Sequence, residues 1–166
     1  MSLSINYKSG QVKGQKLTPL QTSLEPKVTL TGLNTNKFYT LIMYDRNAGT
    51  ISHYYIHWVI VNIPGIDFNK GQTVFKYQGP GPPKGTGQHL YTFVLYLQQD
   101  FNESWSQLND KDKYKSVRDL LYKLSLTNSK IIGNEVKFIS EWVGGNKKRS
   151  TRQKKRRTIR RTIKKR

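Results

Sequence analysis

The chain of 166 residues contains no cysteine, which excludes disulfide and thiolate chemistry, and it is long enough for one domain with a sizeable core. Its net charge of +19 is uneven, because residues 147–166 hold 13 of the 29 Lys and Arg and no acidic residue. The rest of the chain carries 16 basic and 10 acidic side chains, a net charge of only +6, so we assign polyanion binding to the tail rather than to the whole chain.

The sequence has no mark of a membrane-spanning or secreted protein. No apolar run approaches the roughly 18 residues needed to span a bilayer, and the N-terminus lacks the basic start and apolar core of a secretory signal. We therefore expect an intracellular or packaged protein, located in the cytoplasm, the nucleus or a virion.

Short apolar or β-branched runs predict the strands of the body. Residues 1–26 are polar with scattered Gly and Pro, and we expect an irregular lead-in with one edge strand there. The strands expected next, in chain order, cover residues 27–32, 37–44, 54–63, 73–77 and 90–98. The second and third of these runs are continuously apolar and aromatic, which is typical of buried strands.

Helical spacing appears in the last third of the body. Residues 113–124 predict one amphipathic helix, and Asp110 or Asp112 is expected to cap its start. Its apolar face consists of Tyr114, Val117, Leu120, Leu121 and Leu124. A last strand is expected over 135–143, before a glycine hinge over 144–146.

The order of these elements is β-rich, with one late helix and no regular β/α alternation. This order favours a β-sandwich with peripheral helices over a doubly wound fold. We divide the chain into a domain over 1–143 and a basic tail over 144–166.

A glycine-proline segment precedes the strand expected over 90–98. Four glycines and three prolines lie within 79–87, a composition that excludes a helix or a central strand. The prolines fix the path, and the glycines let backbone N–H groups approach a ligand closely. The segment is not a P-loop, because Lys84 precedes Gly85 instead of following a glycine at the start of a helix. It predicts a small binding pocket with His89 at its mouth.

Three polar residues lie in or beside buried strands, namely Asp45, His57 and His89. His57 is either a core histidine satisfied by a backbone carbonyl or one wall of an anion site in which Asp45 orients an imidazole. A zinc or non-haem iron site built from the three is a weaker alternative, since their spacing matches no local metal motif. A serine hydrolase is weaker still, because the chain has no Gly-x-Ser-x-Gly elbow.

The runs Tyr39–Asp45 and Tyr55–Gly65, together with Gly-Pro-Pro-x-Gly-x-Gly-x-His-x-Tyr over 81–91, resemble the phosphatidylethanolamine-binding protein family. This family includes the Raf kinase inhibitor proteins and the plant flowering regulators. Glu141-Trp142 also matches a family motif, so the resemblance extends from Val28 to Trp142.

The resemblance implies an antiparallel β-sandwich, with a large sheet packed on a small one, and a small pocket for phosphate-like anions or phospholipid headgroups. Carried over by motif, the ligand-binding residues are Asp45, His57, Gly81, Pro82, His89 and Tyr91. It also implies a non-enzymatic protein without cofactor or metal, which regulates or inhibits a partner such as a kinase or protease. The sequence agrees, since no activated nucleophile and no close pair of acids is recognisable.

The chain departs from the family pattern around this pocket. Arg46–Gly49 replaces Pro-Asp-Ala-Pro after the first aspartate, Tyr55 replaces a tryptophan, and Leu90 replaces an arginine. The family's C-terminal helix is replaced by Gly144-Gly145 and the tail. We expect the anion pocket to persist with altered selectivity.

The tail is expected to be disordered when free and to bind polyanions, either nucleic acid, an acidic membrane surface or a nuclear import receptor. The residues assigned to this role are Lys147, Lys148, Arg149, Lys154, Lys155, Arg156, Arg157, Arg160 and Arg161. Such tails resemble those on proteins of large DNA viruses. The alternative function is therefore a virion or nucleic-acid-associated packaging protein that acts through the tail.

Overall fold

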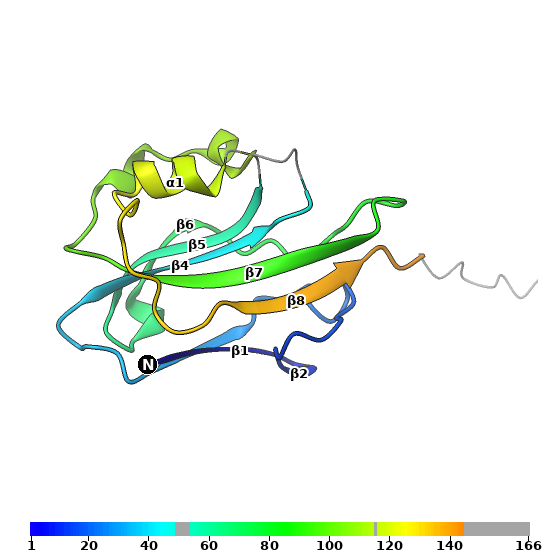
Figure 1. Ribbon diagram of the computed structural model, residues 1–166, viewed down its shortest axis with the longest axis horizontal. Helices are drawn as coiled ribbons and strands as arrows, with labels where there is room; N and C mark the ends of the chain where they lie inside the picture. Colours follow the sequence, from blue (N-terminus) through cyan, green and yellow to red (C-terminus); the bar gives the residue numbers. More distant parts are fainter. Residues whose placement is uncertain (49–53, 115, 145–166) are drawn as a thin grey trace, which may run out of the picture.

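The computed structural model describes residues 1–48, 54–114 and 116–144, which form two antiparallel sheets and few helices (Figure 1). The small sheet has the order β2-β1-β3, with β1 at Ser2–Tyr7, β2 at Gly10–Gln11 and β3 at Lys27–Thr31. The large sheet has the order β6-β5-β4-β7-β8. Its strands are β4 (Phe38–Asp45), β5 (Tyr55–Pro64), β6 (Gln72–Phe75), β7 (Gln88–Leu97) and β8 (Val136–Glu141). The expected mostly β fold, with a large sheet on a small one, is confirmed.

The large sheet is covered on both faces, by the small sheet on one side and by the helical segment on the other (Figure 1). Residues buried between the sheets include Ile5, Leu41, Trp58, Phe93 and Phe138. Residues buried on the helical side include Ile42, Val59, Val94, Leu120 and Leu124. Because both faces are dry, β4 and β5 read as continuous apolar runs instead of alternating ones.

The helical segment differs from the expected single helix over 113–124. It consists of the short 3₁₀ turns η2 (Ser104–Gln107) and η3 (Asp110–Tyr114), followed by α1 (Val117–Lys123). A further 3₁₀ turn, η1 (Phe68–Lys70), lies between β5 and β6.

The expectation that Asp110 or Asp112 caps the start of the helix was wrong. The N-cap of α1 is Ser116, whose Oγ accepts the Asp119 backbone N–H at 3.0 Å. The Asp112 carboxylate instead accepts the Asn109 backbone N–H at 2.9 Å and pairs with Lys123 at 2.7 Å. It therefore closes the turn before the helix.

The N-terminal segment is also more ordered than expected. β1 lies in the middle of the small sheet, paired with β2 on one side and β3 on the other, so the expectation of a lead-in with one edge strand was wrong. The alternating Leu3, Ile5 and Tyr7 are all buried, and this period-2 pattern drives β1 onto the large sheet.

None of the helices in the described part of the chain has the length and apolarity that crossing a bilayer requires. The nine basic residues assigned to polyanion binding lie outside the described residues, as does most of the expected hinge over 144–146. The division into a domain and a tail stays a prediction.

Candidate functional site

A cavity of about 220 Å³ opens where one end of the large sheet meets the glycine-proline segment. It is lined by Asp45, Ala48, Tyr55, His57, Gln78, Gly79, Gly81, Pro82, Pro83, His89 and Tyr91. The structure thus brings all six residues expected from the sequence to one cavity. The strands β4, β5 and β7 supply the titratable groups, and the glycine-proline segment supplies the opposite wall.

Asp45 ends β4, where it pairs with Tyr91 of β7 and with Tyr55 of β5. Its Oδ2 lies 2.6 Å from Nδ1 of His89, and both side chains are only 2% exposed. Its Oδ1 accepts the Asn47 backbone N–H at 2.8 Å. Asp45 therefore fixes a proton on Nδ1 of His89 and orients the ring.

The other ring nitrogen of His89 is also engaged, by a residue that the sequence did not identify. Nε2 lies 2.8 Å from Oγ1 of Thr86, and Thr86 donates its hydroxyl proton to the Pro83 carbonyl, also at 2.8 Å. Thr86 therefore contacts Nε2 while Asp45 contacts Nδ1, so both ring nitrogens of His89 have a hydrogen-bond partner. The sequence feature that could have identified Thr86 is Gly-Thr-Gly. Gly85 and Gly87 have φ of +85° and +78°, which turns the Thr86 hydroxyl toward His89.

The order Thr86–His89–Asp45 superficially matches a hydrolase triad. A nucleophile must give its proton to the histidine, however, and the Thr86 proton goes to the Pro83 carbonyl. This arrangement leaves the threonine unactivated.

His57 has the backbone-bonded environment of the first interpretation, and the anion-site interpretation stays a prediction. Its Nδ1 lies 2.7 Å from the Gln78 carbonyl, so it is a core histidine bonded to backbone, yet it also lines the cavity. Burial lowers the pKa of His57, and the Gln78 carbonyl and Asp45 offset this only in part. At neutral pH the ring is therefore uncharged, with its proton on Nδ1 and an accepting lone pair on Nε2.

Tyr91 joins the two histidines on the floor of the cavity. Its ring centroid lies 5.1 Å from that of His57 and 5.2 Å from that of Phe138, and the side chain is 1% exposed. Burial, and then the Asp45 carboxylate, raise the pKa of Tyr91 well above its usual value. The phenol keeps its proton and remains a hydrogen-bond donor.

Two glycines of the cavity wall have different roles. A Cβ at Gly79 would lie 2.7 Å from the Thr22 carbonyl oxygen, so this glycine is required by packing against the lead-in. A Cβ at Gly81 would meet nothing within 4 Å.

Tyr77 anchors the glycine-proline segment, because its hydroxyl donates to the Thr22 carbonyl at 2.7 Å and lies 2.8 Å from the Tyr7 hydroxyl.

Two residues that depart from the family pattern, Asn47 and Leu90, contact each other. Asn47 Oδ1 accepts the Leu90 backbone N–H at 2.8 Å, which ties the segment after β4 to β7. Arg46 lies 3.2 Å from the Tyr44 hydroxyl and 3.6 Å from Glu135 and does not line the cavity. Residues 49–53 lie outside the described residues.

Within the described ranges, no three His, Cys, Asp or Glu side chains are grouped closely enough to hold a metal ion. Both ring nitrogens of His89 are also committed to Asp45 and Thr86.

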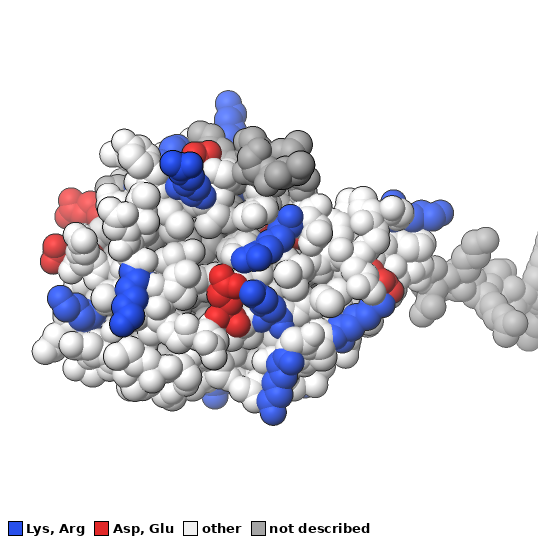
Figure 2. All heavy atoms as spheres, in the orientation of Figure 1, with Lys and Arg blue, Asp and Glu red and all other residues white. Residues whose placement is uncertain are grey.

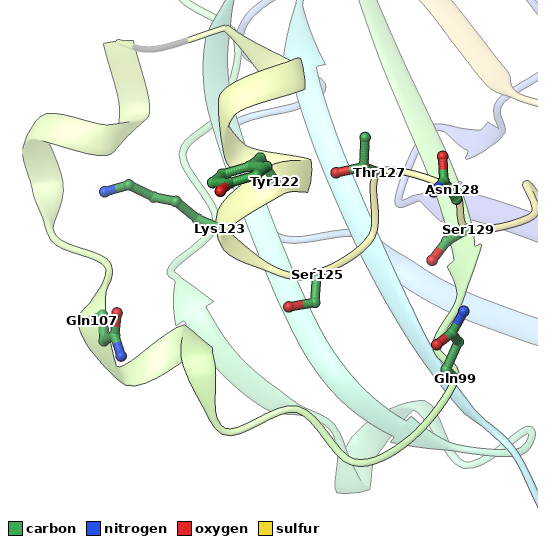
Figure 3. Close-up of a pocket in the computed structure, with 8 residues that line it drawn as sticks. All are labelled: Gln99, Gln107, Tyr122, Lys123, Ser125, Thr127, Asn128 and Ser129. Carbon is green, nitrogen blue, oxygen red and sulfur yellow. The ribbon is translucent and has the colours of Figure 1, made fainter.

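A larger hollow of about 660 Å³ lies beside α1 and the turn that follows it (Figure 3). It is lined by Gln99, Gln107, Tyr122, Lys123, Ser125, Thr127, Asn128 and Ser129. These are mostly neutral amides and hydroxyls, and Lys123 is paired with Asp112. The larger hollow offers few charged donors to an anion. The smaller cavity, lined by Asp45, His57 and His89, is therefore the stronger candidate for an anion site.

Comparisons with known proteins agree with this geometry. The family model for phosphatidylethanolamine-binding protein matches residues 5–136. Putative odorant-binding protein A5 of Drosophila melanogaster is 31% identical over 139 residues, which is 78% of this chain and 64% of the relative. Protein TERMINAL FLOWER 1 of Arabidopsis thaliana is 29% identical over 120 residues, which is 69% of this chain and 67% of the relative. The chain thus spans about two thirds of the length of each.

A solved structure of carboxypeptidase Y inhibitor in complex with its cognate proteinase shares the fold, with a TM-score of 0.63 and 20% identity. The likeness covers 84% of this chain and 82% of the inhibitor. With the family match over most of the body, the two-sheet architecture and the histidine-lined cavity, the chain belongs to the phosphatidylethanolamine-binding protein family.

Proposed function

We propose that the protein is a non-enzymatic binding module whose cavity, lined by Asp45, His57 and His89, takes a phosphate-like anion such as a phospholipid headgroup. The observation that carries this proposal is the buried Asp45–His89 pair beside a second histidine and a protonated tyrosine. At about 220 Å³ the cavity suits a single small headgroup. It is smaller than the roughly 300–1,000 Å³ of pockets for drug-sized ligands.

The anion takes the place that Thr86 holds on His89. An anion oxygen is a stronger acceptor than a hydroxyl for Nε2–H of a ring whose other nitrogen is paired with a carboxylate. His57 contributes once its Nε2 is protonated, because only then are both of its nitrogens donors. Binding therefore takes up a proton at His57.

The family membership and the solved inhibitor complex support a regulatory role. We propose that the protein acts by binding a second protein, a kinase or a protease, with the anion pocket next to the contact surface. Catalysis receives no support from the cavity, since the Thr86 proton is held by the Pro83 carbonyl.

The test is calorimetric titration of the full chain with O-phosphoethanolamine and with inorganic phosphate. His57→Ala and His89→Ala should each weaken binding by at least about tenfold, the value of one lost charge-assisted hydrogen bond. Tyr122→Ala, in the larger hollow, should bind like the wild type. Unchanged affinity in both histidine variants, with circular dichroism showing folded protein, would overturn the assignment. A loss of affinity in Tyr122→Ala alone would assign the binding site to the larger hollow.

The alternative, a virion or nucleic-acid-associated packaging protein, rests on the charge of +13 in residues 147–166. It stays a prediction.

A further inference from the structure

The end of β8 brings an exposed tryptophan to the anion pocket. β8 pairs with β7 so that Ser140 lies opposite His89 and Glu141 opposite Gln88. Trp142 follows two residues after Ser140, about 7 Å further along an extended chain. The Lys84 ammonium lies 5.5 Å from the centre of the Trp142 ring, and Lys84 directly follows Pro83 in the pocket wall. Trp142 is thus held beside the pocket by both neighbouring segments.

The surface formed by Lys84, Trp142 and Val143, here called the rim, mixes apolar and basic groups. Trp142 is 44% exposed and Val143 is 48% exposed. The backbone of Gly144 packs against the Trp142 ring, since a Cβ there would lie 3.3 Å from it. An exposed indole beside a lysine matches the residues that settle at a membrane–water interface, where the ring body is apolar and the N–H stays wet.

The charge around the rim favours an anionic surface. Glu141, the acid next to Trp142, is paired with Lys16, which lowers the pKa of Glu141, and the ion pair as a whole carries no net charge. The chain leaves the body at this same end, where β8 stops near the glycine-proline segment (Figure 1). Figure 2 shows basic side chains above and below this point on the face in view. The 13 Lys and Arg of 147–166 follow directly in the sequence.

We propose that the rim docks on a bilayer containing anionic phospholipid, with the mouth of the anion pocket facing the membrane. One headgroup enters the pocket, Trp142 enters the interface and the tail binds the surface charge, at about 1 kcal/mol per basic residue near such a membrane. This inference rests on the proposed headgroup pocket. A nucleic acid would use the tail, but it gives no role to the exposed Val143 or to a small buried pocket next to it.

The experiment is co-sedimentation of the full chain with vesicles of phosphatidylcholine alone and of phosphatidylcholine mixed with phosphatidylserine. Wild type should bind the mixed vesicles, and binding should weaken with salt. Trp142→Ala should bind about tenfold more weakly, as expected for an aromatic side chain that no longer enters the interface. The matched control is Tyr122→Ala, an aromatic side chain that is 77% exposed beside α1 and should bind like the wild type.

A second variant tests the tail in the full chain. Neutralising Arg156, Arg157, Arg160 and Arg161 together to Gln should weaken binding to mixed vesicles on the order of 1,000-fold. Wild-type vesicle binding by either this variant or Trp142→Ala would overturn the proposal. So would tight binding of duplex DNA with none to the mixed vesicles, which would assign the tail to nucleic acid.

The two proposals fail separately. Trp142 does not line the pocket, so Trp142→Ala should titrate with soluble O-phosphoethanolamine like the wild type. If O-phosphoethanolamine does not bind while Trp142→Ala still reduces vesicle binding, the membrane-facing rim stands and the pocket assignment falls. If O-phosphoethanolamine binds but Trp142→Ala leaves vesicle binding unchanged, the pocket stands and the rim proposal falls.

Discussion

The Nδ1 atom of His89 lies 2.6 Å from Oδ2 of Asp45, with both side chains 2% exposed. Removing one partner leaves the other buried without compensation, so Asp45→Ala should lower the free energy of unfolding by about 3 kcal/mol. Urea unfolding followed by circular dichroism measures this. The control is Asp67→Asn, because the exposed Asp67–Lys70 pair should contribute less than about 1 kcal/mol. Equal losses in the two variants would contradict a special role for the buried pair.

Thr86 competes with the ligand for His89. Thr86→Val removes the hydroxyl that is hydrogen-bonded to Nε2, so affinity for inorganic phosphate should rise about two- to fivefold, as when one neutral hydrogen bond no longer has to be broken. Thr86→Ser keeps the hydroxyl and should bind like the wild type. Calorimetric titration measures both. A fall in affinity in Thr86→Val alone would show instead that the hydroxyl itself contacts the anion.

The pH dependence of stability follows from His57. Its pKa in the folded state is lowered by burial from 6.5, so the unfolded state binds the proton more readily. The stability that neutral His57 contributes is complete above pH 6.5 and is lost as the pH falls through the folded-state pKa. Thermal unfolding between pH 8 and pH 5, roughly spanning the usual pKa range of histidine, should show this decline, and His57→Gln should flatten it. An equal decline in His57→Gln would assign it to another group.

The two glycines of the pocket wall form a matched pair. Gly79→Ala places a Cβ against the Thr22 carbonyl and should cost about 1–3 kcal/mol, as overpacking does. Gly81→Ala meets open space, so the protein should keep its stability while the methyl group reduces phosphate affinity. Thermal unfolding and calorimetry on both variants separate the effects. Destabilisation by Gly81→Ala would mean that its role is also packing.

Much of the large sheet could be predicted from the sequence. The apolar runs over 37–44 and 54–63 lie within one or two residues of β4 and β5, because strands buried on both faces need uninterrupted apolar sequence. The residues of the candidate pocket came from motif resemblance, and the structure brings them to one cavity. What they bind stays a prediction.

Other features depend on contacts that no local pattern reveals. Thr86 reaches His89 only because two residues with positive φ fold the turn back. Likewise Asn62, with φ of +55°, exchanges buried hydrogen bonds with Gln98 and Asn102, which lie 36 and 40 residues away. The sequence does not predict that these polar residues hydrogen-bond to one another, because the tertiary fold determines which of them lie close together.

The position of Asp45 on β4 has a consequence for how the binding site can change. β4 lies between β5, which carries His57, and β7, which carries His89, so the sheet order places one strand between the two histidines. Backbone hydrogen bonds of the core fix this separation, and a one-residue slip of β7 would turn His89 to the opposite face. Substitutions in the surrounding loops can therefore change which molecule enters the cavity, while the sheet sets the relative positions of Asp45, His57 and His89.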